Sequence, residues 1–262
     1  MKANEASTLI TGATGGLGTE IAHQLAEGGA RLLITGRIPL RLSLLADDLR
    51  EAGADVETVV ADLCLAEDRE RLAEMAASRQ VNCLINNAGI NGFADFSRQA
   101  PADIERILAT TLEAPMQLTR LVLPHLLAQP HALVVNVGSV FGAQPVPGFV
   151  TYSVAKAGLR AFTHSLRREL AHSRVRVIHV APRAMDTEMN TDAIAAFNLE
   201  TKAVTDSPND VAWRIVKAIE EETPEVFIGF QEGLAARLNG VVPTWFDRTM
   251  IGASAAARRH TP

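Results

Sequence analysis

The amino-acid sequence predicts an α/β protein: a single doubly wound domain in which helices flank a mostly parallel seven-stranded sheet. Short, β-branched apolar runs alternate with longer amphipathic runs along the chain, the pattern of strands alternating with helices. The strand candidates are nearly all apolar, as expected of parallel strands that are covered on both faces. No linker rich in Pro, Gly or Ser interrupts the alternation. These observations favour one domain over two.

The expected strands are 7–11, 31–35, 56–60, 81–86, 133–137, 175–180 and 226–228. The expected helices between them include 18–27, 40–51, 67–78, 104–127 and 154–171. In a doubly wound sheet, ligands bind outside the carboxyl ends of the strands. The candidate functional residues are therefore those that directly follow each strand.

The composition excludes several classes of protein. With 47% hydrophobic and 21% charged residues, the chain can bury a substantial core. A net charge of −5, with no basic cluster apart from Arg258-Arg259, argues against nucleic acid as a partner. Cys64 and Cys83 form no disulfide framework, and neither the cysteines nor the histidines show metal-ligand spacing. We expect no metal.

The N-terminal residues MKANEAS are polar and do not resemble a signal peptide. No apolar stretch reaches the ~18 residues that a membrane-spanning helix needs. Together with two cysteines that read as reduced thiols, these features lead us to expect a cytoplasmic protein.

A glycine-rich segment, TGATGGLG at 11–18, follows the first expected strand and opens a helix. Gly12, Gly16 and Gly18 allow a tight turn and a close approach of backbone to a ligand. The helix that follows offers unpaired N–H groups and the positive end of its dipole. This context predicts a binding site for the pyrophosphate of a dinucleotide.

The spacing T-G-x-x-x-G-x-G resembles the short-chain dehydrogenase/reductase family, and further motifs of that family follow in order. They are Asp62-Leu63, Asn86-Asn87-Ala88-Gly89, Asn136-Val-Gly-Ser139, Tyr152-x-x-x-Lys156, and Pro182 with Thr187. The resemblance extends over about residues 7–228. It implies a Rossmann-type dinucleotide-binding domain over residues 1–230, followed by a C-terminal extension, 231–262.

The resemblance also implies which residues contact a nicotinamide dinucleotide. They are Gly12, Thr14, Gly16, Leu17, Gly18, Arg37, Asp62, Leu63, Asn87, Ala88, Gly89, Tyr152, Lys156, Pro182, Met185 and Thr187. The second strand ends Thr35-Gly36-Arg37, where NAD-specific relatives carry an acid for the ribose 2′-hydroxyl. Because the acid is absent and arginine suits a 2′-phosphate, with Arg41 a turn further on, we expect NADP(H) to be preferred over NAD(H). The alternative is that Arg37 is an ordinary surface charge.

Tyr152 is the only tyrosine of the chain, and it precedes Lys156 by four residues. On a helix this spacing puts both side chains on one face. A free tyrosine has a pKa near ~10, and a neighbouring ammonium lowers it. The resemblance implies that Tyr152 is the general acid/base, that Ser139 holds the substrate's carbonyl oxygen, and that Lys156 tunes Tyr152 and orients the cofactor.

Two positions depart from the family's pattern. Thr111 stands where the family carries an asparagine that helps to relay protons to the lysine. A threonine hydroxyl can donate and accept but reaches less far, so we expect a working, slower relay. Arg183 replaces the glycine that follows Pro182. It either points to solvent or lies at the pocket mouth, where it would favour anionic substrates such as acyl thioesters.

We therefore expect an NADP(H)-dependent oxidoreductase that interconverts a ketone and a secondary alcohol by hydride transfer. The expected substrate is a small-molecule 3-oxoacyl thioester or another lipid-like carbonyl. The resemblance further implies a homodimer or homotetramer, built largely on 104–127 and 152–171. A non-catalytic NADP-binding redox sensor or scaffold is the alternative from another class.

The segments after Pro182 leave alternatives open. Within 184–204, the apolar residues Met185, Met189, Ile194 and Phe197 either line the substrate pocket or pack a lid helix on the body. The extension 231–262 could pack on its own body or a partner subunit, cap a lipid-sized pocket, or lie on a membrane surface. Packing is favoured, because Asp247 and the glycines disfavour a long membrane helix.

Overall fold

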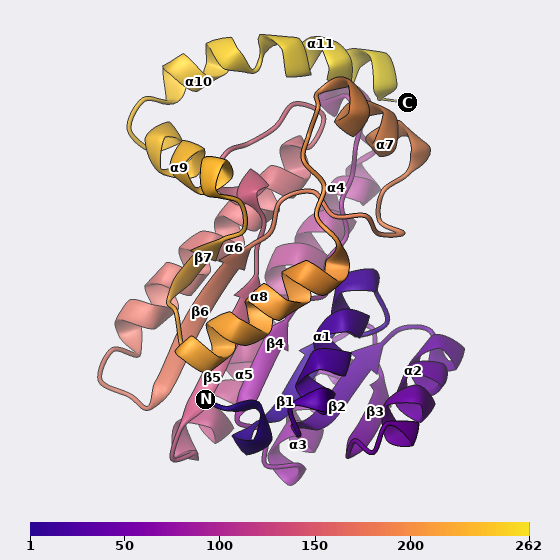
Figure 1. Cartoon of the computed structure of the whole chain (residues 1–262), viewed down its shortest axis with the longest axis vertical. Helices are drawn as coiled ribbons and strands as arrows, with labels where there is room; N and C mark the ends of the chain where they lie inside the picture. Colours follow the sequence, from indigo (N-terminus) through magenta and orange to yellow (C-terminus); the bar gives the residue numbers. More distant parts are fainter. Residues whose placement is uncertain (262) are drawn as a thin grey trace.

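The computed structural model describes residues 1–261, except for the side chains of Phe230 and Arg237. Its centre is a seven-stranded, all-parallel sheet with the strand order β3-β2-β1-β4-β5-β6-β7 (Figure 1). The strands are β1 (Ser7–Thr11), β2 (Arg31–Gly36), β3 (Val56–Val60), β4 (Cys83–Asn86), β5 (Ala132–Val137), β6 (Val175–Ala181) and β7 (Glu225–Phe227). The order reverses between β1 and β4, which confirms the predicted doubly wound fold.

Helices cover both faces of the sheet (Figure 1). One face packs against α1 (Gly16–Glu27), α2 (Pro39–Glu51) and α8 (Pro208–Glu221). The other packs against α3 (Ala66–Ser78), α5 (Ala114–Ala128) and α6 (Val150–Glu169). The inner strands β1, β4 and β5 are buried along their whole length between two helical layers, which is why they are almost continuously apolar, whereas the edge strands β3 and β7 are only partly covered.

The parallel register sorts alternate strand residues into these two cores. Ile10 pairs with Ile34 and Ile85, and all three are buried under α1, α2 and α8. Their neighbours Leu9, Leu33 and Leu84 point to the opposite face. This two-residue alternation fixes the register, because a slip of one residue would exchange the two faces.

The single helix expected over 104–127 is interrupted. The structure has α4 (Pro101–Leu108), a π-helical turn η3 (Ala109–Glu113), and then α5. Pro115 has no N–H to donate to the carbonyl of Thr111, four residues earlier, so the regular α-helical ladder cannot continue there. The break lies at the position that departs from the family's asparagine.

After β6 the chain rises above the carboxyl edge of the sheet as α7 (Asp192–Glu200), and it returns there after β7 (Figure 1). The extension forms α9 (Phe230–Asn239), α10 (Pro243–Thr249) and α11 (Ile251–His260), which arch over that end. α11 is held to α7 by Arg259 and His260, which both pair with Glu200. Within 1–261, no helix combines the length and the apolar character needed to cross a membrane.

Candidate active site

The glycine-rich turn lies between β1 and α1 at the carboxyl edge of the sheet. Gly12 has φ +63°, and a Cβ there would lie 2.8 Å from the Cα of Ala88. A Cβ on Gly18 would collide with the carbonyl oxygen of Gly12. The amide nitrogen Nδ2 of Asn87 donates to the carbonyls of Thr11 (3.0 Å) and Gly12 (3.1 Å) and so fixes the turn. Glycine is required here by close backbone approach, as the sequence predicted.

At the end of β2, Gly36 packs closely against Thr14. A Cβ on Gly36 would lie 2.9 Å from Oγ1 of Thr14, so the Thr14 side chain occupies the space that a larger residue would need. Arg37 follows and is exposed, and no hydrogen bond or ion pair joins its guanidinium to another described residue. Arg41, in the first turn of α2, donates to Oε2 of Glu188 at 2.7 Å. This corner therefore presents two guanidinium groups.

Asp62 and Leu63 follow β3, at the same edge of the sheet. The Asp62 carboxylate accepts from the backbone N–H of Cys64 at 2.9 Å, which shapes the turn after the strand. The Leu63 side chain is buried in the core under α3 and α5. Their proposed contact with the adenine end of a cofactor stays a prediction.

Ser139, Tyr152 and Lys156 come together beside the glycine turn. Ser139 follows β5, and its Oγ accepts from the backbone N–H of Phe141 at 3.2 Å. α6 begins at Val150, earlier than expected, so Tyr152 and Lys156 lie in its first two turns. The buried Lys156 ammonium donates to the carbonyl of Val137 at 2.8 Å. The end of β5 thus supplies both the serine and the anchor for the lysine.

The protonation states of this group are set mainly by burial. Although the Tyr152 side chain is partly exposed, the burial of its surroundings raises its pKa to about 12, and a hydrogen bond with Ser139 offsets part of the rise. This is opposite to the lowering by Lys156 that the sequence predicted. Burial lowers the pKa of Lys156 to about 8. At neutral pH the tyrosine therefore carries its proton and the lysine is mostly charged.

Thr111 is fully buried in the π-helical turn, next to Gly89. Its hydroxyl accepts from the backbone N–H of Ile90 and donates to the carbonyl of Ile90, both at 3.1 Å. A Cβ on Gly89 would lie 3.6 Å from the Thr111 Oγ1 and 3.7 Å from the Lys156 Nζ, so Gly89 separates the two groups. The only hydroxyl proton of Thr111 is thus used by Ile90, and its side chain fixes the backbone beside the lysine.

The residues after β6 divide between the site and the core. The carbonyl of Pro182 accepts from the N–H of Val140 at 2.9 Å, which ties this segment to β5. Thr187 lies against the glycine turn, with its Cγ2 3.1 Å from the position of a Cβ on Gly16. The Met185 side chain packs against the core under α1 and α8. Pro182 and Thr187 therefore lie beside β5 and the glycine turn, whereas the Met185 side chain packs on the body.

Arg183 fits neither alternative that the sequence left open. Its guanidinium donates twice to Asp206 (2.9 and 2.8 Å) and once to Glu232 in α9 (3.1 Å). These carboxylates raise the pKa of Arg183 above its usual range. The arginine is neither solvated nor free to attract an anionic substrate. It joins the segment after β6 to the C-terminal extension.

Apolar side chains surround the tyrosine on the side away from the glycine turn. Phe93, Phe149 and Phe197 form a buried cluster with ring centroids 4.8–6.0 Å apart. The Tyr152 ring meets the Phe149 ring edge-on, with their centroids 6.4 Å apart. Ile194 joins this cluster from α7, and Ala256 and Ala257 join it from α11, whereas Met189 is exposed. α7 and the extension thus pack an apolar cluster next to the catalytic candidates.

Buried polar residues that the sequence argument left out of the site hold α6 in place. Asn86 donates to Asn136 (2.8 Å), and Asn136 donates to Thr163 of α6 (2.9 Å). The signal was present, since two asparagines sit in otherwise apolar strands and buried amides need partners. This network fixes the helix that carries Tyr152 and Lys156.

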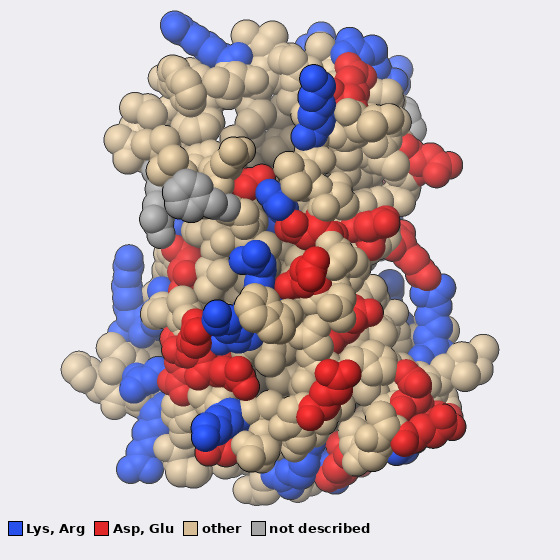
Figure 2. All heavy atoms as spheres, viewed as in Figure 1, with Lys and Arg blue, Asp and Glu red and all other residues tan. Residues whose placement is uncertain are grey.

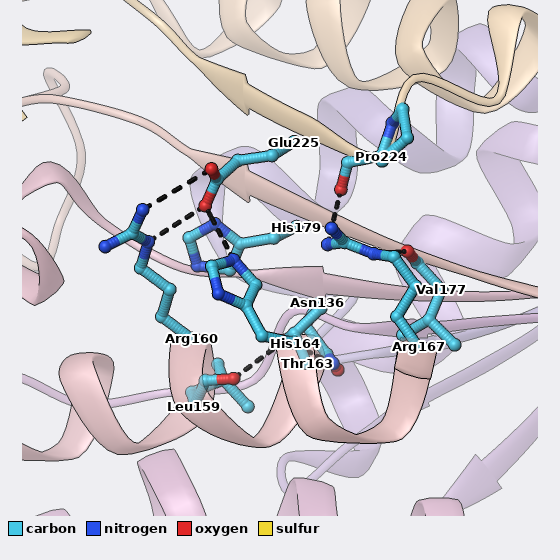
Figure 3. Close-up of polar contacts among 10 residues, drawn as sticks. All are labelled: Asn136, Leu159, Arg160, Thr163, His164, Arg167, Val177, His179, Pro224 and Glu225. Carbon is cyan, nitrogen blue, oxygen red and sulfur yellow. Dashed lines mark hydrogen bonds and ion pairs between the residues drawn. The ribbon is translucent and has the colours of Figure 1, made fainter. Parts of the chain in front are cut away.

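A second group of polar contacts anchors the C-terminal half of α6 to β7 (Figure 3). Glu225 accepts from Arg160 at 2.8 Å and lies 3.0 Å from Nε2 of His164. His179 is buried beside them, and burial lowers its pKa to about 3, so it is neutral. Sequence analysis did not identify Glu225, because only the fold brings it next to α6.

The face of the molecule drawn in Figure 2 carries charges of both signs. Lys and Arg alternate with Asp and Glu over the face seen in Figure 2, which is consistent with the net charge of −5. No group of three or more possible metal ligands occurs among residues 1–261.

Comparison with known proteins identifies the family. A model of the short chain dehydrogenase family matches residues 6–196. Ketoacyl reductase HetN from Nostoc sp. is 31% identical over 231 residues, which cover 85% of this chain and 78% of HetN. The chain belongs to the short-chain dehydrogenase/reductase family, and it is an oxidoreductase that acts on CH–OH or C=O groups.

Solved structures show the same fold. A short-chain dehydrogenase/reductase from Burkholderia phymatum in complex with NAD has a TM-score of 0.83 at 22% identity, covering 92% of this chain and 94% of that one. A short chain dehydrogenase from Burkholderia cenocepacia in complex with NADP has a TM-score of 0.82 at 24% identity, covering 96% and 99%. A nicotinamide dinucleotide fits the residues present here, since the N-terminus of α1 directly follows the glycine turn and has no side-chain cap, which leaves its N–H groups for a pyrophosphate.

Proposed function

We propose that the protein is an NADP(H)-dependent reductase that converts an apolar ketone to a secondary alcohol, and catalyses the reverse reaction, with Tyr152 as the general acid/base. The observation that carries the proposal is the meeting of Ser139, Tyr152 and Lys156 beside the glycine turn. A protein that only bound the dinucleotide would need no proton donor at this place.

Each residue of this group has a separate task. The nicotinamide, when bound, supplies a hydride to the carbonyl carbon. Tyr152, whose raised pKa keeps it protonated, gives its proton to the carbonyl oxygen as the C=O double bond becomes a C–O single bond. Ser139 donates a hydrogen bond to the same oxygen, and the Lys156 ammonium stabilises the phenolate that forms. Solvent then returns the proton to Tyr152.

The end of β2 supports the choice of NADP(H). Position 36 is a glycine that packs against the Thr14 side chain, so the acid that usually pairs with a ribose 2′-hydroxyl is absent. Arg37 is exposed and Arg41 lies a turn away, and both suit a 2′-phosphate. The two structures named above carry NAD in one case and NADP in the other, so the fold alone does not choose.

The apolar cover of Tyr152 supports a lipid-like substrate. Phe93, Phe149 and Phe197 offer aromatic faces but no charge. Arg183 is bound by two carboxylates and gives no preference for an anionic group near the tyrosine. The name of HetN, a ketoacyl reductase, agrees with a 3-oxoacyl compound. A 3-oxoacyl thioester recognised by its acyl chain is therefore the substrate class that we propose.

We also propose that residues 1–230 form the cofactor-binding unit and that 231–262 complete the substrate side.

An oligomer formed through α5 and α6 agrees with the apolar residues exposed on these helices. They are Met116, Leu127, Val150 and Val154, each at least 40% exposed.

The test is oxidation of NADPH and NADH across a panel of carbonyl compounds, followed at the nicotinamide absorbance. The panel contains 3-oxoacyl thioesters, long-chain ketones, steroid ketones and small diketones. We expect turnover with NADPH that is fastest for the apolar substrates. Tight NADPH binding without turnover of any ketone, or of the matching alcohols with NADP⁺, would favour a redox sensor instead.

A further inference from the structure

Residues 187–189, here called the strap, lie across the carboxyl edge of the sheet. The strap follows β6 and makes three contacts with other parts of the chain. The Thr187 side chain packs on Gly16, the Glu188 carboxylate accepts from Arg41 at 2.7 Å, and the Met189 carbonyl accepts from the side chain of Asn91 at 3.3 Å.

Gly16 and Arg41 lie in the first turns of α1 and α2, which follow β1 and β2, and Asn91 lies in the loop that follows β4. A dinucleotide in a doubly wound fold lies along that same edge. The residues on either side of the strap are joined as well, because Asn190 donates to the carbonyls of Thr187 (2.9 Å) and Met185 (2.6 Å). The strap therefore forms an ordered turn above the cofactor site, and its one charged contact is Glu188 with Arg41.

We propose that Glu188 moderates the preference for NADP(H) by competing with its 2′-phosphate for Arg41. This inference rests on the proposed use of NADP(H). The Glu188 carboxylate occupies the guanidinium that a 2′-phosphate would bind. NADP(H) must displace it, whereas NAD(H), which has a 2′-hydroxyl, leaves the ion pair in place.

The competition follows from the chemistry of the guanidinium. A carboxylate and a phosphate accept hydrogen bonds from the same N–H groups in the same plane, so one arginine edge cannot serve both fully. The displaced carboxylate also stays near the phosphate, because the strap is fixed at Thr187 and Met189. Glu188 thus weakens NADPH binding, whereas NADH has no 2′-phosphate for it to oppose.

The size of the effect is limited by exposure. The side chains of Arg41 and Glu188 are 51% and 78% exposed. An exposed ion pair of this kind changes an equilibrium constant by at most about fivefold. Glu188 therefore moderates a preference that the arginines create.

The experiment is calorimetric titration of the protein with NADPH and with NADH, which reads binding without turnover. The variants are Glu188→Gln, Arg41→Gln and the double variant. Asp186→Asn is the control, because Asp186 is an exposed acid two residues away that has no described contact with Arg41.

We expect Glu188→Gln to tighten NADPH binding about three- to fivefold and to change NADH binding less than twofold. In the Arg41→Gln background the same substitution should have no effect, because there is nothing left to compete for. The control should change NADPH affinity less than twofold. Raising the salt concentration should reduce the difference between Glu188→Gln and the unaltered protein.

Other outcomes overturn the inference. Equal tightening for both dinucleotides would mean that the strap opposes binding without reading the phosphate. The same gain from Asp186→Asn, or from Glu188→Gln in the Arg41→Gln background, would mean general repulsion rather than competition. A preference for NADPH that Glu188→Gln leaves unchanged would reject the inference and keep the proposed function. Equal affinity of the unaltered protein for NADH and NADPH would reject the cofactor choice itself.

Discussion

The ammonium nitrogen of Lys156 lies 5.7 Å from the centroid of the Tyr152 ring, one turn away on the same face of α6. Burial shifts the two pKa values in opposite directions: it raises that of the phenol to about 12 and lowers that of the ammonium to about 8. Near neutrality the tyrosine holds a proton to give, and the charged lysine stabilises the phenolate that results.

The first prediction concerns pH. Above pH 8 a growing fraction of Lys156 loses its proton, because its pKa is lowered to about 8, and the phenolate loses its stabilising charge. We expect kcat/KM for carbonyl reduction to fall on the alkaline side with an apparent pKa near that value. Lys156→Arg, whose guanidinium stays charged, should move the fall to higher pH even if the rate is lower. A profile that stays flat to about pH 10 in the unaltered enzyme would contradict this.

The second prediction concerns Thr111. Thr111→Val keeps the shape but removes the hydroxyl, leaving the part-buried N–H and C=O of Ile90 without their partner. We expect a loss of about 1–3 kcal/mol in the free energy of unfolding and a lower kcat. Thr111→Asn restores the family's residue and should keep or raise kcat. A large loss of kcat in Thr111→Asn, with folding intact, would show that the site has adapted to threonine.

The third prediction concerns Arg183. Arg183→Ala leaves Asp206 and Glu232 facing each other without a cation. The ion pairs are only partly buried, so we expect roughly 1–3 kcal/mol of lost stability, measured by denaturant unfolding. Glu232→Gln is the matched variant and should cost less, because Asp206 still holds the arginine.

Michaelis constants distinguish an arginine that only holds the extension on the body from one that binds substrate. If Arg183 only ties the extension to the body, Arg183→Ala should change KM for anionic and neutral carbonyl substrates by the same factor. A selective rise of KM for anionic substrates would return the arginine to the pocket mouth.

The fourth prediction concerns Glu225 (Figure 3). Burial alone would raise its pKa, but hydrogen bonds from Arg160 and His164 outweigh burial and lower the pKa to about 2. Because the folded value lies below the unfolded value of about 4.3, Glu225 stabilises the fold above that pH, and the contribution is lost as pH falls towards 2. Thermal melts should show Glu225→Gln less stable than the unaltered protein at pH 6, with the gap closing between about pH 4 and 2. A gap independent of pH would contradict the charge-based account.

Local sequence patterns determine most of the fold. The seven strands lie within two residues of their expected ends, because apolar β-branched runs and the turns between them are local signals. The expected helix 104–127 was wrong in its middle. Pro115 is visible in the sequence. The sequence alone, however, does not tell a proline in the first turn of a new helix from one inside a longer helix; the π-helical backbone around Thr111 decides it.

The positions of the proposed site residues followed from motif order, whereas their interactions did not. Tyr152 and Lys156 are four residues apart, so helical periodicity places them together. The partners of Arg41 and Arg183 are Glu188, Asp206 and Glu232, which lie 23–147 residues away in sequence. No local pattern indicates such pairs. The pKa of Tyr152 was misjudged for the same reason, since burial depends on the whole fold.

The most direct test of the proposed chemistry is Tyr152→Phe, which removes one hydroxyl and keeps the ring against Phe149. Turnover with the best carbonyl substrate and the Kd for NADPH are measured on the same preparation. We predict that kcat falls by at least about a thousandfold while the Kd changes less than about threefold, as expected when a general acid is lost and binding contacts remain. Turnover within about tenfold of the unaltered enzyme would show that another group supplies the proton, and the proposed role of Tyr152 would be wrong.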